Sequence, residues 1–213
     1  MSINSAKSTV MKICKSKTVA FPAEVRVNGT LLEIKNEVKI LGVILMPNLK
    51  WGANTRFICK KAYNSMWLLR RMKKLGLDTC TLTEYFMKEV RVHLELAVPV
   101  WQSGLTKKLS SEIERVQKIA INIILGHNEY SYARACSVLG LTPLHIRREK
   151  LCERFSLKTA SKSRHSDLFQ LEKNNRHGHD TRSKNDRYRG HKCRKVRFYN
   201  SPLPFLTRTL NQL

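Results

Sequence analysis

The chain has 213 residues, 42% of them hydrophobic, which is enough for one domain, or for one and a half, around a real core. Its formal net charge of +24 comes from 40 Lys and Arg against 16 Asp and Glu and favours a polyanionic partner, above all nucleic acid. The six cysteines stand singly, as is typical of free thiols rather than of a zinc ribbon or a disulfide framework. Without a long apolar stretch or a secretory leader, we expect a nuclear or cytoplasmic location and no membrane partner.

Residues 8–50 have the pattern of β-strands. The stretch EVRVNGTLLEI alternates around Asn28-Gly29, which predicts a hairpin with its turn at that pair. A further strand, VKILGVILM, follows with Gly42 in its middle, where glycine indicates a bulge or a close backbone approach. Pro47-Asn48 then ends the strand. We predict three strands at most, which is little to be stable alone.

Residues 53–160 have helical periodicity. In the first predicted helix the apolar residues recur at helical spacing, and Gly76 is placed to end it. These apolar residues of the first helix are Ile58, Ala62, Met66 and Leu69. The third helix is predicted over residues 107–125, with Gly126 at its end.

The second helix is predicted to start near Asp78 or Thr81, with Glu84 placed for a capping box, and to stop before Pro99. A short fourth helix is predicted from Ser131 to Gly140. The fifth helix opens with Thr142 as its N-cap and Pro143 at the first helical position.

From about Ser161 the helical pattern fails. The stretch KNNRHGHDTRSKNDRYRGHKCRK is polar, basic and aperiodic, which is typical of a disordered or loosely held segment. The end of the chain, RFYNSPLPFLTRTL, regains apolar and aromatic residues, so we expect it to dock back onto the helices.

Five segments carry a resemblance to a known family through their order along the chain. They are KILGVILMPNLKW, ICKKAYNSMWLLRRMKKLGL, LELAVPVWQSGLTKKLSSEIERVQKIAINIILG, LGLTPLHIRREKLCERF and RFYNSPLPFLTRTLN. In this order they resemble the C-terminal part of jockey-like non-LTR retrotransposon reverse transcriptases, which are RNA-directed DNA polymerases. INSAKSTVMKI resembles that family's Asn-x-x-Lys segment just past the active site, so the resemblance covers almost the whole chain. Each segment is a weak motif by itself, and the five in order are specific.

The resemblance implies a role for particular positions. Asn4 and Lys7 fall in the last palm motif, where Lys7 would be a general acid only if the upstream palm is present. Leu41-Gly42-Val43 would be the primer grip, and the helices from residue 53 onward would form a thumb that follows a template–primer duplex through phosphate contacts.

The resemblance and the basic composition together predict sequence-independent binding of RNA or DNA. The residues expected at this interface are Lys39, Gly42, Lys60, Lys61, Arg70, Arg71, Lys73, Lys74, Arg147 and Arg148.

The polymerase chemistry of the family depends on palm aspartates that bind magnesium, and these residues are missing here. No Tyr-Ala-Asp-Asp turn occurs in the chain, and the first acidic residue is Glu24, inside the predicted hairpin. We therefore expect no catalytic residues, no metal site and no cofactor for this chain. It also departs from the family at Asn54, Leu96 and Gln102, which we interpret as relaxed constraint.

The predicted fold class is α+β. Residues 1–52 form a short antiparallel palm remnant with the primer-grip hairpin, residues 53–160 a mainly α-helical thumb-like domain, and residues 161–213 a basic, partly disordered tail with a C-terminal apolar segment. Strands cut off from a larger sheet keep exposed edges, so the N-terminal part is expected to be the weak one.

Three hypotheses for function follow. The first is a truncated reverse transcriptase fragment that binds RNA or DNA without chemistry. The second is the C-terminal half of an active RNA-directed DNA polymerase, with Met1 a false start of the gene. The third is a domesticated helical scaffold for a protein partner, which would have an exposed apolar patch and weak affinity for nucleic acid.

Other groups of residues favour ordinary explanations. The histidines and cysteine of the tail match no usual zinc finger, and the serine, glutamate and histidine of the third helix region lack a nucleophile elbow. The three tryptophans are more typical of packing in the core or at a domain edge than of base stacking. The residues concerned are His177, His179, His191, Cys193, Ser111, Glu112, His127, Trp51, Trp67 and Trp101.

Overall fold

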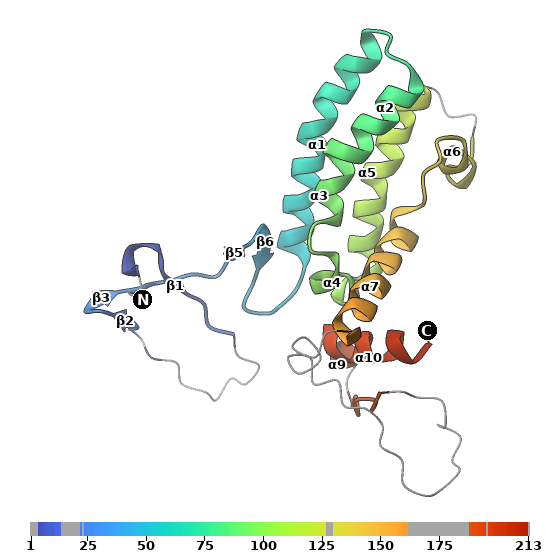
Figure 1. Cartoon of the computed structure of the whole chain (residues 1–213). Helices are drawn as coiled ribbons and strands as arrows, with labels where there is room; N and C mark the ends of the chain where they lie inside the picture. Colours follow the sequence, from blue (N-terminus) through green and yellow to red (C-terminus); the bar gives the residue numbers. More distant parts are fainter. Residues whose placement is uncertain are drawn as a thin grey trace, which may run out of the picture.

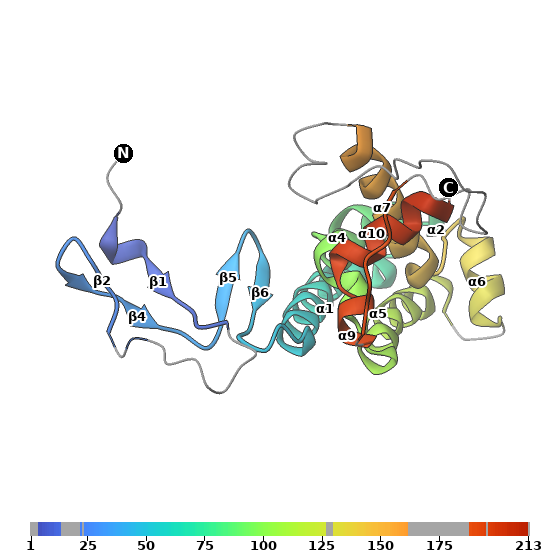
Figure 2. The same ribbon diagram turned by 90° about the horizontal axis from the view of Figure 1, so that it is seen from below.

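The structure is a computed structural model that describes residues 4–13, 22, 24–126, 130–161, 188–194 and 196–212. Most of these residues are helical and the strands are few and short, which is compatible with the α+β class. The strands lie to one side of a bundle of helices, and the C-terminal helices lie at the lower end of the bundle (Figures 1 and 2). No helix within the described ranges is both long and apolar enough to cross a lipid bilayer.

The part of the chain before the first long helix contains six short strands among its described residues. These are β1 (Thr9–Val10), β2 (Arg26–Val27), β3 (Thr30–Leu31), β4 (Glu33–Ile34), β5 (Val38–Ile40) and β6 (Val43–Leu45). They form three separate pairs: β1 with β4 in parallel, and β2 with β3 and β5 with β6 antiparallel. The prediction of three strands at most is therefore wrong, and the strands are not all antiparallel.

Two tight turns produce the antiparallel pairs. Asn28 and Gly29 have φ values of 50° and 77°, the left-handed pair that a two-residue hairpin needs, so the hairpin predicted there is confirmed. Leu41 and Gly42 form a second turn, with φ values of 47° and 87°. VKILGVILM is thus a hairpin of β5 and β6 rather than one strand with Gly42 inside it.

Helix α1 (Gly52–Lys74) presents its predicted apolar residues to the core. Ile58 is 2% exposed, and Ala62, Met66 and Leu69 are fully buried. The helix ends in a Schellman arrangement, in which the N–H of Gly76 donates to the carbonyl of Lys73 and the N–H of Leu77 to that of Met72. Gly76 has a φ of 79°, so the predicted role of this glycine is confirmed.

The second predicted helix is divided into α2 (Thr79–Tyr85), the π-helical segment η2 (Phe86–Val90) and α3 (Arg91–Glu95), and it ends before Pro99 as predicted. The short helix α4 (Val98–Trp101) and the 3₁₀ turn η3 (Gln102–Gly104) follow it. Asp78 caps the start by accepting from the N–H of Thr81 at 3.0 Å. Glu84 makes no capping box, because its carboxylate binds Lys88 at 2.8 Å instead. The break falls at Ala97, whose φ is 51°, and Pro99 opens α4.

Helix α5 (Lys107–Leu125) has the predicted bounds. The Thr106 hydroxyl accepts from the N–H of Leu109 at its start, and Gly126, with a φ of 88°, ends it. Its buried residues pack against α1, which is the most extensive helix contact in the described part of the chain. They are Ile113, Val116, Gln117, Ala120, Ile121 and Ile124.

Two helices follow, α6 (Tyr132–Val138) with Ser131 as its cap and α7 (Leu144–Ser161). Helix α7 begins one residue after Pro143, which was predicted as its first helical position. The carboxylate of Glu114 on α5 binds the start of α7, since it accepts from the N–H groups of Leu144 at 2.8 Å and His145 at 3.0 Å.

Glu114 is also the acceptor for a third donor, the hydroxyl of Tyr132 on α6. Gln117 supports this contact by donating its side-chain amide to the Tyr132 oxygen at 3.0 Å. Both residues lie on α5, so one face of α5 holds α6 and α7 together. The carboxylate is only 12% exposed, and an acceptor buried in this way is costly to remove.

The C-terminal end of the chain is helical. Helix α9 (Val196–Tyr199) precedes α10 (Pro202–Gln212), which packs on α7 and α4 with Leu206 and Leu210 buried. Docking of the apolar end, predicted from the sequence, is confirmed. Most of the predicted disordered segment, residues 162–187, lies outside the described residues.

We predict that backbone amides of residues 25–45 exchange with solvent faster than those of α1 and α5. Each strand there is two or three residues long and has a partner on one edge only among the described residues. Short two-stranded pieces are marginally stable in water. Hydrogen exchange followed by mass spectrometry tests this, and equal protection of residues 25–45 and α1 would contradict it.

We predict that Glu114→Gln lowers the free energy of unfolding by about 3 kcal/mol, because it removes a buried charge that faces Arg148 and weakens the cap of α7. Urea unfolding monitored by circular dichroism measures the change. Glu84→Gln is the matched control, since it breaks an exposed pair with Lys88 and should leave the midpoint nearly unchanged. Similar midpoints for both variants would refute the role given to Glu114.

We predict that iodoacetamide labels Cys80 much faster than Cys59 or Cys152 in the folded protein. Burial raises the pKa of Cys59 to about 11 and that of Cys152 to about 12, whereas Cys80 is exposed. The thiolate is the reactive form, so both buried thiols should be inert at neutral pH. Peptide mass spectrometry locates the label. Labelling of all three at one rate in the native state, as in denaturant, would contradict the structure.

Candidate nucleic-acid interface

The positive charge of α1 is not balanced within the helix. Its 23 residues include seven Lys and Arg and no Asp or Glu. A helix of one sign offers no i, i+4 acidic neighbour to its cations. The apolar face of α1 packs on α5 and α3, so the exposed cations lie on the sides that remain. They are Arg56, Lys60, Arg70, Arg71 and Lys74.

Five exposed residues lie along one line of this helix, and we call them the α1 stripe: Arg56, Lys60, Trp67, Arg71 and Lys74. Their spacing of three, four or seven residues places them on one face. At the helical rise per residue the stripe is about 27 Å long. None of its four cations forms an ion pair with a described acidic residue. These charges are therefore available to an external anion.

The three tryptophans divide into two kinds. Trp51 is 9% exposed and Trp101 is fully buried, as predicted for core residues. Trp67 is 62% exposed, and the guanidinium of Arg71 lies 5.4 Å from the centre of its ring. Of the predicted core or domain-edge positions, the core one is therefore wrong for Trp67, which lies in the middle of the α1 stripe.

The β5–β6 hairpin is attached to the first turns of α1. The N–H of Ile44 donates to the side chain of Asn54 at 3.1 Å. The ammonium groups of Lys39 and Lys61 each lie 5.0 Å from the ring of Phe57. Lys39 is exposed and Lys61 is half-buried, so of these two predicted residues Lys39 is the more available to a partner.

Gly42 lies at the tip of this hairpin and faces the bundle. A Cβ atom at this position would lie 2.8 Å from Cδ2 of Leu96. The glycine therefore permits close packing of the turn on Leu96 as well as the left-handed φ. This contact gives Gly42 a structural role that needs no nucleic acid.

Three of the residues predicted at the interface have partners inside the protein. Lys73 donates to the carbonyl of Ile124 at 2.8 Å and so joins α1 to the end of α5. Arg147 forms a two-pronged ion pair with Glu95. Neither cation is free to bind phosphate, because each would first have to break a partly buried hydrogen bond or ion pair within the protein.

Arg148 is the third of these residues, and its predicted place at the interface is wrong because its side chain is fully buried. It donates to the side chains of Gln102 and Ser110, each at 2.8 Å, and one nitrogen lies 3.9 Å from Glu114. Burial lowers the pKa of Arg148, and the nearby carboxylate of Glu114 opposes that shift. Its task is to neutralise Glu114 inside the bundle.

The residues that depart from the family pattern all have contacts here. Asn54 accepts from the hairpin, Gln102 accepts from Arg148, and the carbonyl of Leu96 accepts from the indole of Trp101 at 2.9 Å. Such contacts are costly to lose. The interpretation of relaxed constraint stays a prediction for these three positions, and the contact of Leu96 is made by its backbone carbonyl rather than by its side chain.

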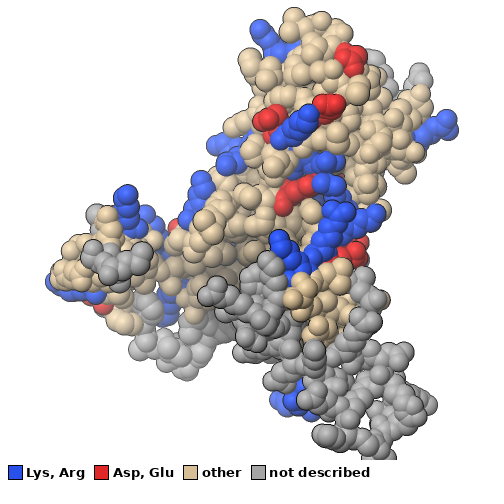
Figure 3. All heavy atoms as spheres, viewed as in Figure 1, with Lys and Arg blue, Asp and Glu red and all other residues tan. Residues whose placement is uncertain are grey.

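The face of the molecule drawn in Figure 3 carries more positive than negative charge. On the face shown in Figure 3, Lys and Arg side chains are spread over the helices and strands and predominate over Asp and Glu. Sequence reasoning missed Arg56 as an interface residue. The helical period would have found it, because Arg56, Lys60 and Arg71 share one face.

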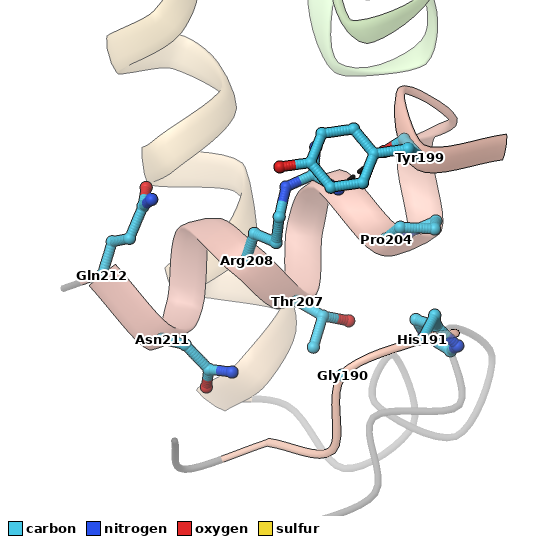
Figure 4. A pocket seen from close by; sticks show the side chains of 8 residues that line it. All are labelled: Gly190, His191, Tyr199, Pro204, Thr207, Arg208, Asn211 and Gln212. Carbon is cyan, nitrogen blue, oxygen red and sulfur yellow. Dashed lines mark hydrogen bonds between the residues drawn. The ribbon is translucent and has the colours of Figure 1, made fainter. Parts of the chain in front are cut away.

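Two hollows lie elsewhere. One, of about 490 Å³, is mostly apolar and lies between α4, α7 and α10; it is lined by Ala97, Pro99, Val100, Cys152, Phe155, Ser156, Pro202, Phe205 and Leu206. The other, of about 240 Å³, has a mixed polar and apolar lining, to which Gly190, His191, Tyr199 of α9 and residues of α10 contribute (Figure 4). There the guanidinium of Arg208 lies 3.6 Å from the centre of the Tyr199 ring and donates to the Tyr199 carbonyl. That cation is thus engaged within the protein.

The remaining predicted groups do not assemble into a site. Asn4 and Lys7 lie at the exposed 3₁₀ turn η1 (Ser5–Lys7). His177 and His179 lie outside the described residues. In the described ranges no three His, Cys, Asp or Glu side chains are grouped closely enough to hold a metal ion.

The fold and the stripe together define a mainly helical protein with an unpaired basic surface on one long helix. No protein-family model, no curated protein and no solved structure matches the chain.

Proposed function

We propose that this chain is a nucleic-acid-binding fragment of a jockey-like non-LTR retrotransposon reverse transcriptase, and that it binds RNA or DNA through the α1 stripe without performing chemistry. The observation that carries the proposal is the line of four exposed, unpaired cations on a helix that has no acidic residue. Its length of about 27 Å lets it meet several successive phosphates of one nucleic acid, because phosphates lie only a few ångströms apart.

The binding is sequence-independent in this proposal. Lys and Arg on an exposed helix surface contact phosphates, which fix position but carry no sequence information. The net charge of +24 adds long-range attraction and speeds association. Binding of this kind releases counterions and weakens steeply as salt is raised.

The order of elements supports the reverse transcriptase origin. The segment KILGVILMPNLKW forms the β5–β6 hairpin and the turn after it, and the next segment forms most of α1. A hairpin followed directly by a helical domain is the arrangement that primer grip and thumb would have. The proposal is limited to binding because the chain has no Tyr-Ala-Asp-Asp turn.

A second candidate, the scaffold for a protein partner, is favoured by the apolar groove between α4, α7 and α10. Part of its lining is open to solvent, since Val100 is 44% and Phe155 37% exposed. No residue of α1 lines this groove. A scaffold would therefore bind its partner independently of the α1 stripe, and its affinity for nucleic acid would be weak.

We predict that the logarithm of the binding constant for RNA falls steeply and linearly with the logarithm of salt concentration. Reversing two charges of the stripe, in the variant Lys60→Glu/Arg71→Glu, should weaken binding and reduce the slope by about two. Fluorescence anisotropy with a labelled RNA across a salt series measures both quantities.

The matched control is Lys150→Glu/Lys158→Glu, two exposed lysines of α7. Both variants lower the net charge by four, from +24 to +20, so general electrostatic attraction is changed equally. A loss confined to the stripe variant supports the proposal. Equal losses of RNA affinity in both variants would assign binding to the overall charge. Binding that is absent or independent of salt would contradict the nucleic-acid function and favour the scaffold.

A further inference from the structure

We infer that Trp67 is a stacking platform for an unpaired base, so that the α1 stripe selects single-stranded nucleic acid over duplex. The inference rests on the proposed function and adds the class of ligand. It starts from the exposure of the Trp67 indole, 62%, against 9% for Trp51 and 0% for Trp101. A large aromatic side chain left in water on a helix surface is ready to bury its face against a ligand.

The neighbours of Trp67 decide what kind of ligand fits. Arg71 lies one turn further along α1 and places its guanidinium 5.4 Å from the ring centre, while Lys60 and Lys74 lie two turns away on either side. In a nucleic acid strand each base lies between two phosphates, so a base could contact the Trp67 ring while the flanking phosphates meet the cations on either side. An apolar protein surface would have to cover these unpaired charges, which is costly.

The geometry favours an unpaired base over a duplex. In a duplex the faces of the bases are covered by their neighbours, and only their edges are open to a protein. A base in a single strand can swing out and lay its face on an indole or a guanidinium. Trp67 and Arg71 offer both kinds of flat surface side by side.

Intrinsic fluorescence reports on this site selectively, because the other two tryptophans are buried in the core. The protein is titrated with oligouridylate, with oligothymidylate and with an RNA hairpin duplex of the same charge. Both single strands should quench the exposed fraction of the emission, and the duplex should quench it little. Comparing the two single strands shows whether RNA or DNA is preferred, and either preference supports the inference.

Substitutions at Trp67 test the stacking itself. Trp67→Ala should weaken single-strand binding roughly tenfold and leave duplex affinity almost unchanged. Trp67→Phe keeps a flat ring and should restore most of the affinity, whereas Trp67→Leu keeps apolar area without a π-face and should not. All three substitutions are at the exposed position 67, so thermal unfolding should be unaltered.

The outcomes separate this inference from the proposed function. Single-strand binding that is as tight in Trp67→Ala as in the unaltered protein, or equal affinity for duplex and single strand, overturns the stacking role and leaves phosphate binding by the stripe intact. Absence of binding to any nucleic acid overturns both. Restoration by leucine as well as by phenylalanine would show an apolar contact, as with a protein partner, and would also refute stacking.

Discussion

The carboxylate of Glu114 accepts hydrogen bonds from the first two N–H groups of α7, and the arrangement of the C-terminal helices depends on this capping contact. The first turn of any helix leaves N–H groups without partners, and burying them against a neighbour is costly unless an acceptor is supplied. Because Glu114 lies on α5, the contact fixes the start of α7 on the bundle. Helix α10 packs on α7 in turn, so the same carboxylate positions the end of the chain.

The same contact determines which positive charges remain for a partner. With α7 held at Glu114, Arg148 lies inside the bundle, where polar side chains and a carboxylate surround it. Arg147 meets Glu95, and Lys73 reaches a carbonyl of α5. The chain has 40 Lys and Arg but only 16 Asp and Glu, so most of its cations cannot pair internally. Helix α1, which contains no acid, keeps a line of unpaired ones.

Helix α1, which carries the stripe, is held in place at several points along its length. Helix α1 is held by α5 along its core face, by the side chain of Asn54 at the hairpin and by Lys73 at its end. Side chains fixed on a rigid helix lose little freedom when they bind, so a partner gains more from each contact. The short strands contribute the position of Lys39, while the bundle supplies the platform that presents Trp67.

The sequence by itself determined the basic character, the long helices and the Asn28-Gly29 turn, because charge, periodicity and backbone preference depend on composition and near neighbours. It missed the second hairpin turn, since leucine rarely adopts the left-handed conformation of Leu41. Only the tertiary structure decided that Arg148 is buried and Trp67 exposed. Burial depends on which helix faces meet, and a contact between Glu114 and a backbone group thirty residues away along the chain decides that for α7. The cations left outside such contacts make the surface available for binding.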